Sequence, residues 1–207
     1  MGTEVAPVRL RPFAVPFLAF VGCCLVSSTV HEPVPRTHDE FSYILMGETF
    51  ARGHVANASP PLPEFFDTFH VLVRPAYASK YFPVQGIFLT LGEKLGGHPA
   101  IGVWLSSALA CAALVWMLEA WISPGWALLG GFIVVIQYGI YSYWSQTYWG
   151  GMATALGGAL FFGALRRLWD RFSWQNPDSD SWGGQNLFDI YTKSQGEGLD
   201  GTKYKDW

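Results

Sequence analysis

Formal charges are scarce in this sequence, and the shortage falls mainly in one region. Charged residues make up 14% of the 207 residues, whereas they make up about a quarter of a typical soluble domain. Between residues 96 and 165 the only formal charge is that of Glu119. A long apolar region with so few charges is typical of an integral membrane protein.

The sequence also lacks a basic excess and a cysteine framework. The formal net charge is −3, so we expect no nucleic-acid partner. The three cysteines Cys23, Cys24 and Cys111 lie in apolar segments, and none of them forms a Cys-x-x-Cys metal motif. This pattern excludes a disulfide-stabilised secreted domain, and we expect the cysteines to be small buried side chains.

Four apolar segments can cross a membrane as helices, for which about 17 residues or more are needed. They cover residues 13–30, 98–122, 126–148 and 150–168. The predicted fold class is therefore an all-α integral membrane protein with about four transmembrane helices. A large external first loop with interfacial helices and a polar C-terminal tail complete the predicted architecture.

Basic residues at the ends of these segments predict the orientation of the chain. Arg9 and Arg11 lie at the start of the first segment, and Arg166, Arg167 and Arg171 lie at the end of the fourth. Because basic residues concentrate on the cytoplasmic side of membranes, residues 1–12 and the tail at residues 169–207 are expected in the cytoplasm. Residues 31–97 then form the external loop, and the predicted location is the bacterial inner (cytoplasmic) membrane.

Two parts of the loop have helical character. Phe41, Ile44 and Leu45 share one side at helical spacing, which predicts a helix over residues 39–52. Residues 87–95 are apolar but too short to span a membrane, so we expect an interfacial or re-entrant helix there.

Three motifs follow one another in an order found in one family of membrane enzymes. The first is an Asp-Glu pair with a tyrosine and a later glycine, at Asp39, Glu40, Tyr43 and Gly53. The others are the runs KYFPVQG at residues 80–86 and YWGG at residues 148–151. Over about residues 11–167 this order resembles the N-terminal membrane module of GT-C glycosyltransferases, such as protein O-mannosyltransferases and aminoarabinose transferases.

The resemblance implies roles for the two acids. In the family, the first aspartate of this loop acts as general base on the acceptor hydroxyl, or holds a metal or the acceptor in place. Asp39 would take that role, with Glu40 as a helper, because a carboxylate can accept the hydroxyl proton. A polyprenyl-phosphate sugar would be the donor, and no other cofactor is predicted.

Further residues would bind the substrates in such an enzyme. Lys80 and Arg74 could face the donor phosphate, which needs cations. The loop histidines, His70 among them, show no spacing that would bring three or four metal ligands together, so no metal site is predicted. The substrate-binding candidates are Tyr43, Arg74, Lys80 and Tyr81.

Two features differ from the family. Gly150 and Gly151 stand where family enzymes commonly carry a further acid, and family enzymes have many more spans. The main prediction is therefore an accessory or structural transmembrane subunit of a larger bacterial membrane complex, built on a shortened, non-catalytic module. The alternative is an inverting glycosyltransferase that uses Asp39 as base and works with a partner chain.

The polar tail bears on the partners of the chain. Its scattered aromatic residues are candidate contacts with other proteins. Expected partners are lipids and other membrane protein subunits, with photosynthetic and respiratory assemblies as examples of hosts. The candidate contact residues are Trp174, Trp182, Phe188, Tyr191 and Trp207.

Overall fold

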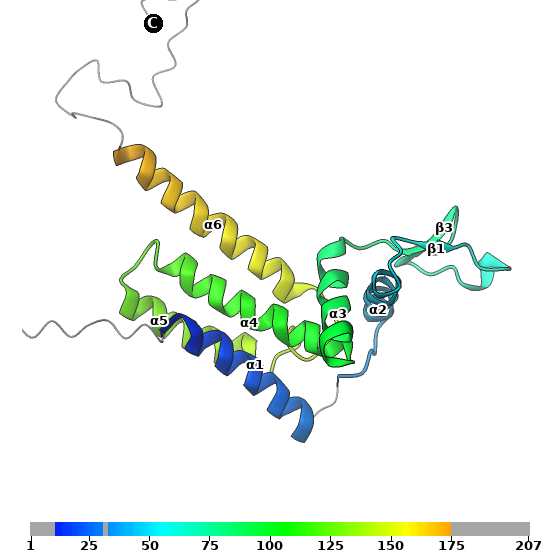
Figure 1. The fold of residues 1–207 in the computed structure, drawn as a ribbon, viewed down its shortest axis with the longest axis horizontal. Helices are drawn as coiled ribbons and strands as arrows, with labels where there is room; N and C mark the ends of the chain where they lie inside the picture. Colours follow the sequence, from blue (N-terminus) through cyan, green and yellow to red (C-terminus); the bar gives the residue numbers. More distant parts are fainter. Residues whose placement is uncertain (1–10, 31–32, 175–207) are drawn as a thin grey trace, which may run out of the picture. The chain divides into compact units, whose positions relative to one another are not determined.

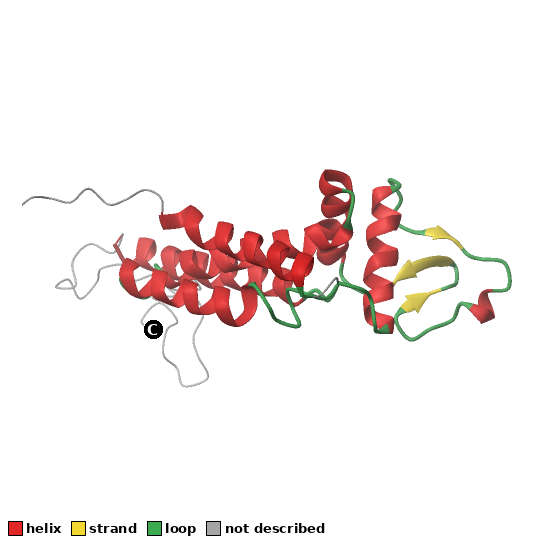
Figure 2. Ribbon diagram, turned by 90° about the horizontal axis from the view of Figure 1, so that it is seen from below, coloured by secondary structure: helices red, strands yellow, loops and turns green. Residues whose placement is uncertain are grey.

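The computed structural model describes residues 11–30 and 33–174. Within them the elements are α1 (Arg11–Thr29), α2 (His38–Ala51), β1 (Asn57–Ala58), the 3-10 helix η1 (Pro63–Phe65), β2 (Val71–Leu72), β3 (Ala76–Ser79), α3 (Pro83–Gly96), α4 (Pro99–Leu118), α5 (Pro124–Val134), the π-helical segment η2 (Val135–Gly139) and α6 (Gly151–Trp174). The mostly helical class predicted from the sequence is confirmed for these residues (Figure 2).

The chain divides into two units, Met1–Ala164 and Leu165–Trp207. In the second unit the structure describes the end of α6, where the Arg166 guanidinium pairs with the Asp170 carboxylate one helical turn later. The earlier elements and the N-terminal part of α6 belong to the first unit, which contains the site discussed below.

Among the described helices, α4 is the one that is both long and apolar enough to cross a membrane. Two further helical stretches, Phe13–Thr29 and Pro124–Gly139, are apolar but shorter. These lengths are compatible with the predicted spans without establishing them. The membrane location of the chain therefore remains a prediction.

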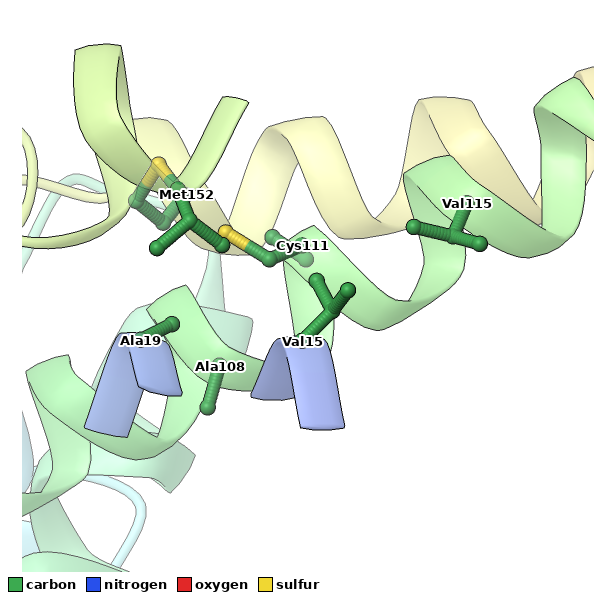
Figure 3. Packing of buried hydrophobic residues seen from close by; sticks show 8 residues of the cluster. Val15, Ala19, Ala108, Cys111, Val115 and Met152 are labelled. Atoms are coloured by element: carbon green, nitrogen blue, oxygen red, sulfur yellow. The ribbon is translucent and has the colours of Figure 1, made fainter. Parts of the chain in front are cut away.

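Helix α4 is central to the packing of the first unit. It contacts α1, α3 and α5, and Figure 1 shows α1 and α5 beside it. The main buried cluster joins Val15 and Ala19 of α1 to Cys111 and Val115 of α4, and Met152 at the start of α6 completes it (Figure 3). Small side chains at these positions allow the helix backbones to approach closely.

Glycines set the distances between α2, α3 and α4. A Cβ atom added at Gly102 of α4 would overlap the backbone carbonyl of Phe88 in α3, and one added at Gly92 would overlap the backbone of Gly102. On the other side of α3, a Cβ added at Gly47 of α2 would lie 2.8 Å from the Leu89 Cβ. The three helices are thus packed nearly backbone to backbone.

A small sheet, which the sequence analysis did not predict, follows α2. The strand order is β1-β3-β2, and both pairings are antiparallel. Val71 of β2 pairs with Ser79 of β3, and Asn57 of β1 pairs with Tyr77. Strands of two to four residues are too short to show a clear alternation of apolar and polar positions.

The segment predicted to span over residues 126–148 is helical only as far as Gly139. Beyond it, polar side chains form local bonds with the backbone: the Ser142 amide donates to Ser145 Oγ at 3.0 Å, and Gln146 Nε2 donates to the Ile140 carbonyl at 2.8 Å. Such local bonds compete with the helical pattern. The segment instead continues without helix to Tyr148, which contacts the start of α2.

Candidate functional site

The start of α2 is tied to the segment that precedes α6. The Tyr148 amide donates to Glu40 Oε1 at 3.1 Å, and the Tyr148 hydroxyl donates to the Pro33 carbonyl at 2.9 Å. Trp149 Nε1 donates to Thr37 Oγ1 at 3.3 Å. These bonds bring together the Asp-Glu and YWGG motifs, which lie far apart in the sequence.

Glu40 has a structural role. Its side chain is 1% exposed, and its Oε2 accepts bonds from the amides of Arg36 at 2.9 Å and Thr37 at 3.1 Å. The second bond forms part of a capping box, in which the Glu40 carboxylate satisfies a backbone donor at the start of α2. Oε1 accepts from the Tyr148 amide, so both oxygens are bonded to the backbone. Glu40, the predicted helper acid, is therefore used to hold the fold.

Asp39, the neighbouring acid, has a different environment. Its Oδ1 lies 3.0 Å from His70 Nδ1 and accepts a hydrogen bond from the Tyr81 hydroxyl. The Tyr81 hydroxyl also lies 2.7 Å from His70 Nδ1. The side chain of Asp39 is 17% exposed and that of His70 is 33% exposed. A carboxylate, an imidazole and a phenol thus meet where solvent can reach them.

The rings around Asp39 are stacked. Tyr81 stacks with Tyr43 at a centroid distance of 4.4 Å and with His70 at 5.5 Å, and both pairs are nearly parallel. Burial raises the pKa of the Tyr43 hydroxyl, and the negative charge of Asp39 raises it further. The Tyr43 hydroxyl therefore stays protonated and available as a donor well into the alkaline range.

The sheet holds His70 against α2. The Ser42 hydroxyl, one turn after Asp39, donates to the His70 carbonyl at 2.6 Å and contacts Ser79 Oγ at 2.7 Å. The Lys80 amide donates to the same carbonyl at 3.1 Å. Ser42 is 1% exposed, and its bonds, which are partly buried, hold the His70 backbone in place. These bonds attach the hairpin formed by β2 and β3 to α2, the helix that carries Asp39.

An apolar cavity begins beside this cluster. Its volume is about 740 Å³, and Tyr43, Tyr138, Trp149, Gly150 and Met152 contribute to its wall. That volume is in the range of ligand pockets, about 300–1,000 Å³. Tyr43 belongs to both features, because its ring lines the cavity and also stacks with Tyr81.

The absence of a side chain at Gly150 keeps the cavity open near Tyr43. A Cβ atom at this position would lie 3.4 Å from the Tyr43 hydroxyl and 3.3 Å from the Gln85 Cβ. Gln85 is itself buried, and its Nε2 donates to the Tyr148 carbonyl at 3.1 Å. Gly150 therefore contributes space at the edge of the site.

The other predicted substrate residues lie at a different cavity, of about 360 Å³. Arg74 and Lys80 line it together with Glu64 and Asp67. Arg74 Nη2 is 3.7 Å from Glu64 Oε2, and Lys80 Nζ donates to the Phe69 carbonyl at 3.0 Å. The structure thus brings the two cations together, but it places them in contacts that do not include Asp39.

Sequence reasoning identified Asp39, Tyr43 and Tyr81 as candidates, and the structure brings these three residues together. It missed the role of His70, which was considered only as a metal ligand. Tyr81 follows Asp39 by 42 residues and His70 by 11 residues, and no local pattern links the three positions. The pairing of β2 with β3 brings His70 and Tyr81 together, and the bonds of Ser42 attach both to the helix that carries Asp39.

Two sets of sequence predictions remain open. Of the tail residues proposed to contact partners, Trp174 ends α6, while Trp182, Phe188, Tyr191 and Trp207 lie outside the described residues. In the described part of the chain, no group of three or more His, Cys, Asp or Glu side chains is arranged to hold a metal ion.

Comparison with known proteins adds no assignment. No family model, curated protein or solved structure matches this chain. Any functional conclusion therefore depends on the geometry of the Asp39 cluster and its cavity.

Proposed function

We propose that this chain carries part of a sugar-transfer site that acts on a lipid-linked donor, with a partner chain completing the site. The observation that carries the proposal is the position of Asp39, a partly exposed carboxylate bonded to Tyr81, whose ring stacks on the Tyr43 that lines an apolar cavity. A proton acceptor next to an apolar cavity suits a reaction between a hydroxyl group and a substrate with a lipid tail.

The proposed reaction is an inverting transfer. The acceptor hydroxyl oxygen forms a bond to the anomeric carbon of the sugar, and the bond from that carbon to the phosphate oxygen breaks. The hydroxyl proton passes to Asp39, and the lipid phosphate leaves with the electron pair of the broken bond. The resemblance to GT-C glycosyltransferases supports a polyprenyl-phosphate sugar as the donor.

The chain's own residues have distinct parts in this scheme. Asp39 accepts the proton, and the Tyr43 hydroxyl is a neutral donor at the cavity wall. Arg74 and Lys80 line the other cavity, so we propose that the partner chain supplies the positive charge facing the donor phosphate. Lipid tails would occupy the apolar cavity.

The test is sugar transfer in membranes that contain the chain, with a radiolabelled polyprenyl-phosphate sugar and D39N as the variant. Loss of a general base lowers such a rate by about 10²- to 10⁴-fold, so we expect at least a 100-fold loss. The matched control is E48Q, which makes the same kind of change at an exposed position of α2 where Glu48 contacts Arg52. Transfer by D39N at the wild-type rate would refute the proposal.

The second candidate is the non-catalytic accessory subunit. It is favoured by the internal contacts of Asp39, which join α2 to the residues that flank the β2–β3 hairpin and would by themselves give this acid a structural role. On that hypothesis D39N lowers the unfolding temperature, and neither the wild type nor the variant transfers sugar. Purification in a mild detergent with mass spectrometry would then identify a multi-subunit complex in stoichiometric amounts.

A further inference from the structure

The two oxygens of the Asp39 carboxylate are not equivalent. Oδ1 is approached by both His70 Nδ1, at 3.0 Å, and the Tyr81 hydroxyl. In the described part of the chain, no donor bonds to Oδ2. The Asp39 side chain is 17% exposed. One of its oxygens is bonded to the protein, and the other is available to a ligand.

The contacts at Oδ1 determine where the protons lie. A carboxylate can only accept hydrogen bonds, so the Tyr81 hydroxyl must point its hydrogen at Asp39. The Tyr81 oxygen lies 2.7 Å from His70 Nδ1, and with its own hydrogen directed at Asp39 it can only accept there. This requires the proton of His70 to sit on Nδ1.

We infer that His70 and Tyr81 are positioning residues that hold Oδ1 and leave Oδ2 as the proton-accepting atom of the proposed transfer. The inference rests on the proposed function and deepens it by naming the reactive oxygen and the residues that orient it. When Oδ2 takes the acceptor proton, Oδ1 keeps its hydrogen bond from Tyr81 as a carbonyl oxygen. Proton transfer then needs no rearrangement of the surrounding groups, as expected of a preorganised site.

The backbone supports this arrangement. The His70 carbonyl accepts bonds from Ser42 of α2 and from the Lys80 amide. His70 and Asp39 are thereby attached to the same helix by separate contacts. The His70 ring in turn stacks on Tyr81 at 5.5 Å, and contacts of this kind restrict the orientation of the ring, which is what a positioning role needs.

The first experiment measures transfer by H70A, H70N, Y81F and the control H54A. His54 is an exposed histidine of the same loop, so H54A should keep the wild-type kcat and KM. H70A and Y81F should lower kcat by about 10- to 100-fold, as expected when groups that orient a reactive side chain are removed, with KM within about twofold of the wild-type value. H70N should recover most of the rate because its amide can still donate a hydrogen to the Tyr81 oxygen.

The second experiment does not depend on activity. Nitrogen-15 NMR of the histidine-labelled full chain reports which ring nitrogen carries the proton. Wild-type His70 should be protonated on Nδ1, and D39N should shift this equilibrium toward Nε2. An Nε2-protonated His70 that does not respond to D39N would overturn the inference whether or not sugar is transferred.

The two experiments separate the two ideas. Suppose that His70 is protonated on Nδ1, that D39N changes this, and that the wild type transfers no sugar. This result would refute the sugar-transfer proposal and would support the contact of His70 and Tyr81 with Asp39. Transfer that D39N abolishes and H70A leaves intact would support the proposed function and overturn the positioning role.

Discussion

Asp39 and Glu40 show how two adjacent acids in one helical turn acquire different uses. Successive residues of a helix point about 100° apart, so only one of the pair can face the helix start and the Tyr148 segment. Glu40 takes that direction and accepts bonds from three residues through its two oxygens. Asp39 faces the hairpin, where its second oxygen is unused.

The first prediction at this scale concerns Glu40. E40Q replaces one of its two accepting oxygens with an amide that donates, and a buried backbone amide then loses its partner. We expect the free energy of unfolding to fall by about 2–3 kcal/mol. Denaturant unfolding of the purified protein measures this loss.

The control variant for this experiment is E48Q. Glu48 forms an exposed pair with Arg52 at 3.3 Å, and such pairs contribute about 0–1 kcal/mol. An equal loss of stability in E40Q and E48Q would show that the buried bonds of Glu40 do not hold α2 in place.

At the scale of elements, the site depends on how closely α3 approaches its neighbours. Tyr148 packs against Leu89 of α3 and against Val103 of α4. The same cluster is bordered by Tyr43 of α2. Any separation of α3 from α4 would therefore move the wall of the cavity together with the residues that hold Asp39.

The second prediction is that G102A destabilises the fold. The added Cβ would overlap the Phe88 carbonyl in α3, and backbone atoms cannot rotate away as a side chain can. Overpacking of this kind costs about 1–3 kcal/mol or more, so we expect a lower unfolding temperature. Thermal unfolding followed by circular dichroism measures the shift.

The matched control is G157A in α6. A Cβ at Gly157 would have open space around it, and alanine is favoured over glycine in a helix by about 0.5–1 kcal/mol. This variant should be as stable as the wild type or slightly more stable. If G102A behaved in the same way, the close contact between α3 and α4 would not be a feature of the folded protein.

At the scale of the whole molecule, the proposed function requires the Asp39 site to face the outside of the membrane. The sequence predicts this orientation from its arginines. Helix α4 has the length and composition of a spanning helix. The chain would then present the loop on one side and the turn before α5 on the other.

The third prediction tests that orientation. In whole cells, a membrane-impermeant maleimide should label V55C, because Val55 is 85% exposed in the loop. It should not label G125C, although a Cβ at Gly125 would have open space around it. The three native cysteines are replaced with alanine in both variants. In permeabilised cells the maleimide should label both V55C and G125C. Labelling of G125C alone in intact cells would reverse the proposed topology.

How far the sequence predicted this protein differs from element to element. The spacing of Phe41, Ile44 and Leu45 predicted a helix over residues 39–52, and α2 covers nearly the same residues. Residues 140–150 were assigned mainly to a span, yet the helix ends at Gly139. Beyond it Ser142, Ser145 and Gln146 form local bonds, which apolar composition cannot reveal.

The sequence by itself determined the helical class, the apolar segments and the presence of an acid pair after the first of them, because composition and periodicity are local properties. Only the tertiary structure decided that Glu40 supports the scaffold while Asp39 meets His70 and Tyr81. Those contacts depend on the pairing of two very short strands and on the contact of Tyr148 with the start of α2. Both join residues that are distant in the chain. They are stabilised by packing between separate segments, which no single stretch of sequence can reveal.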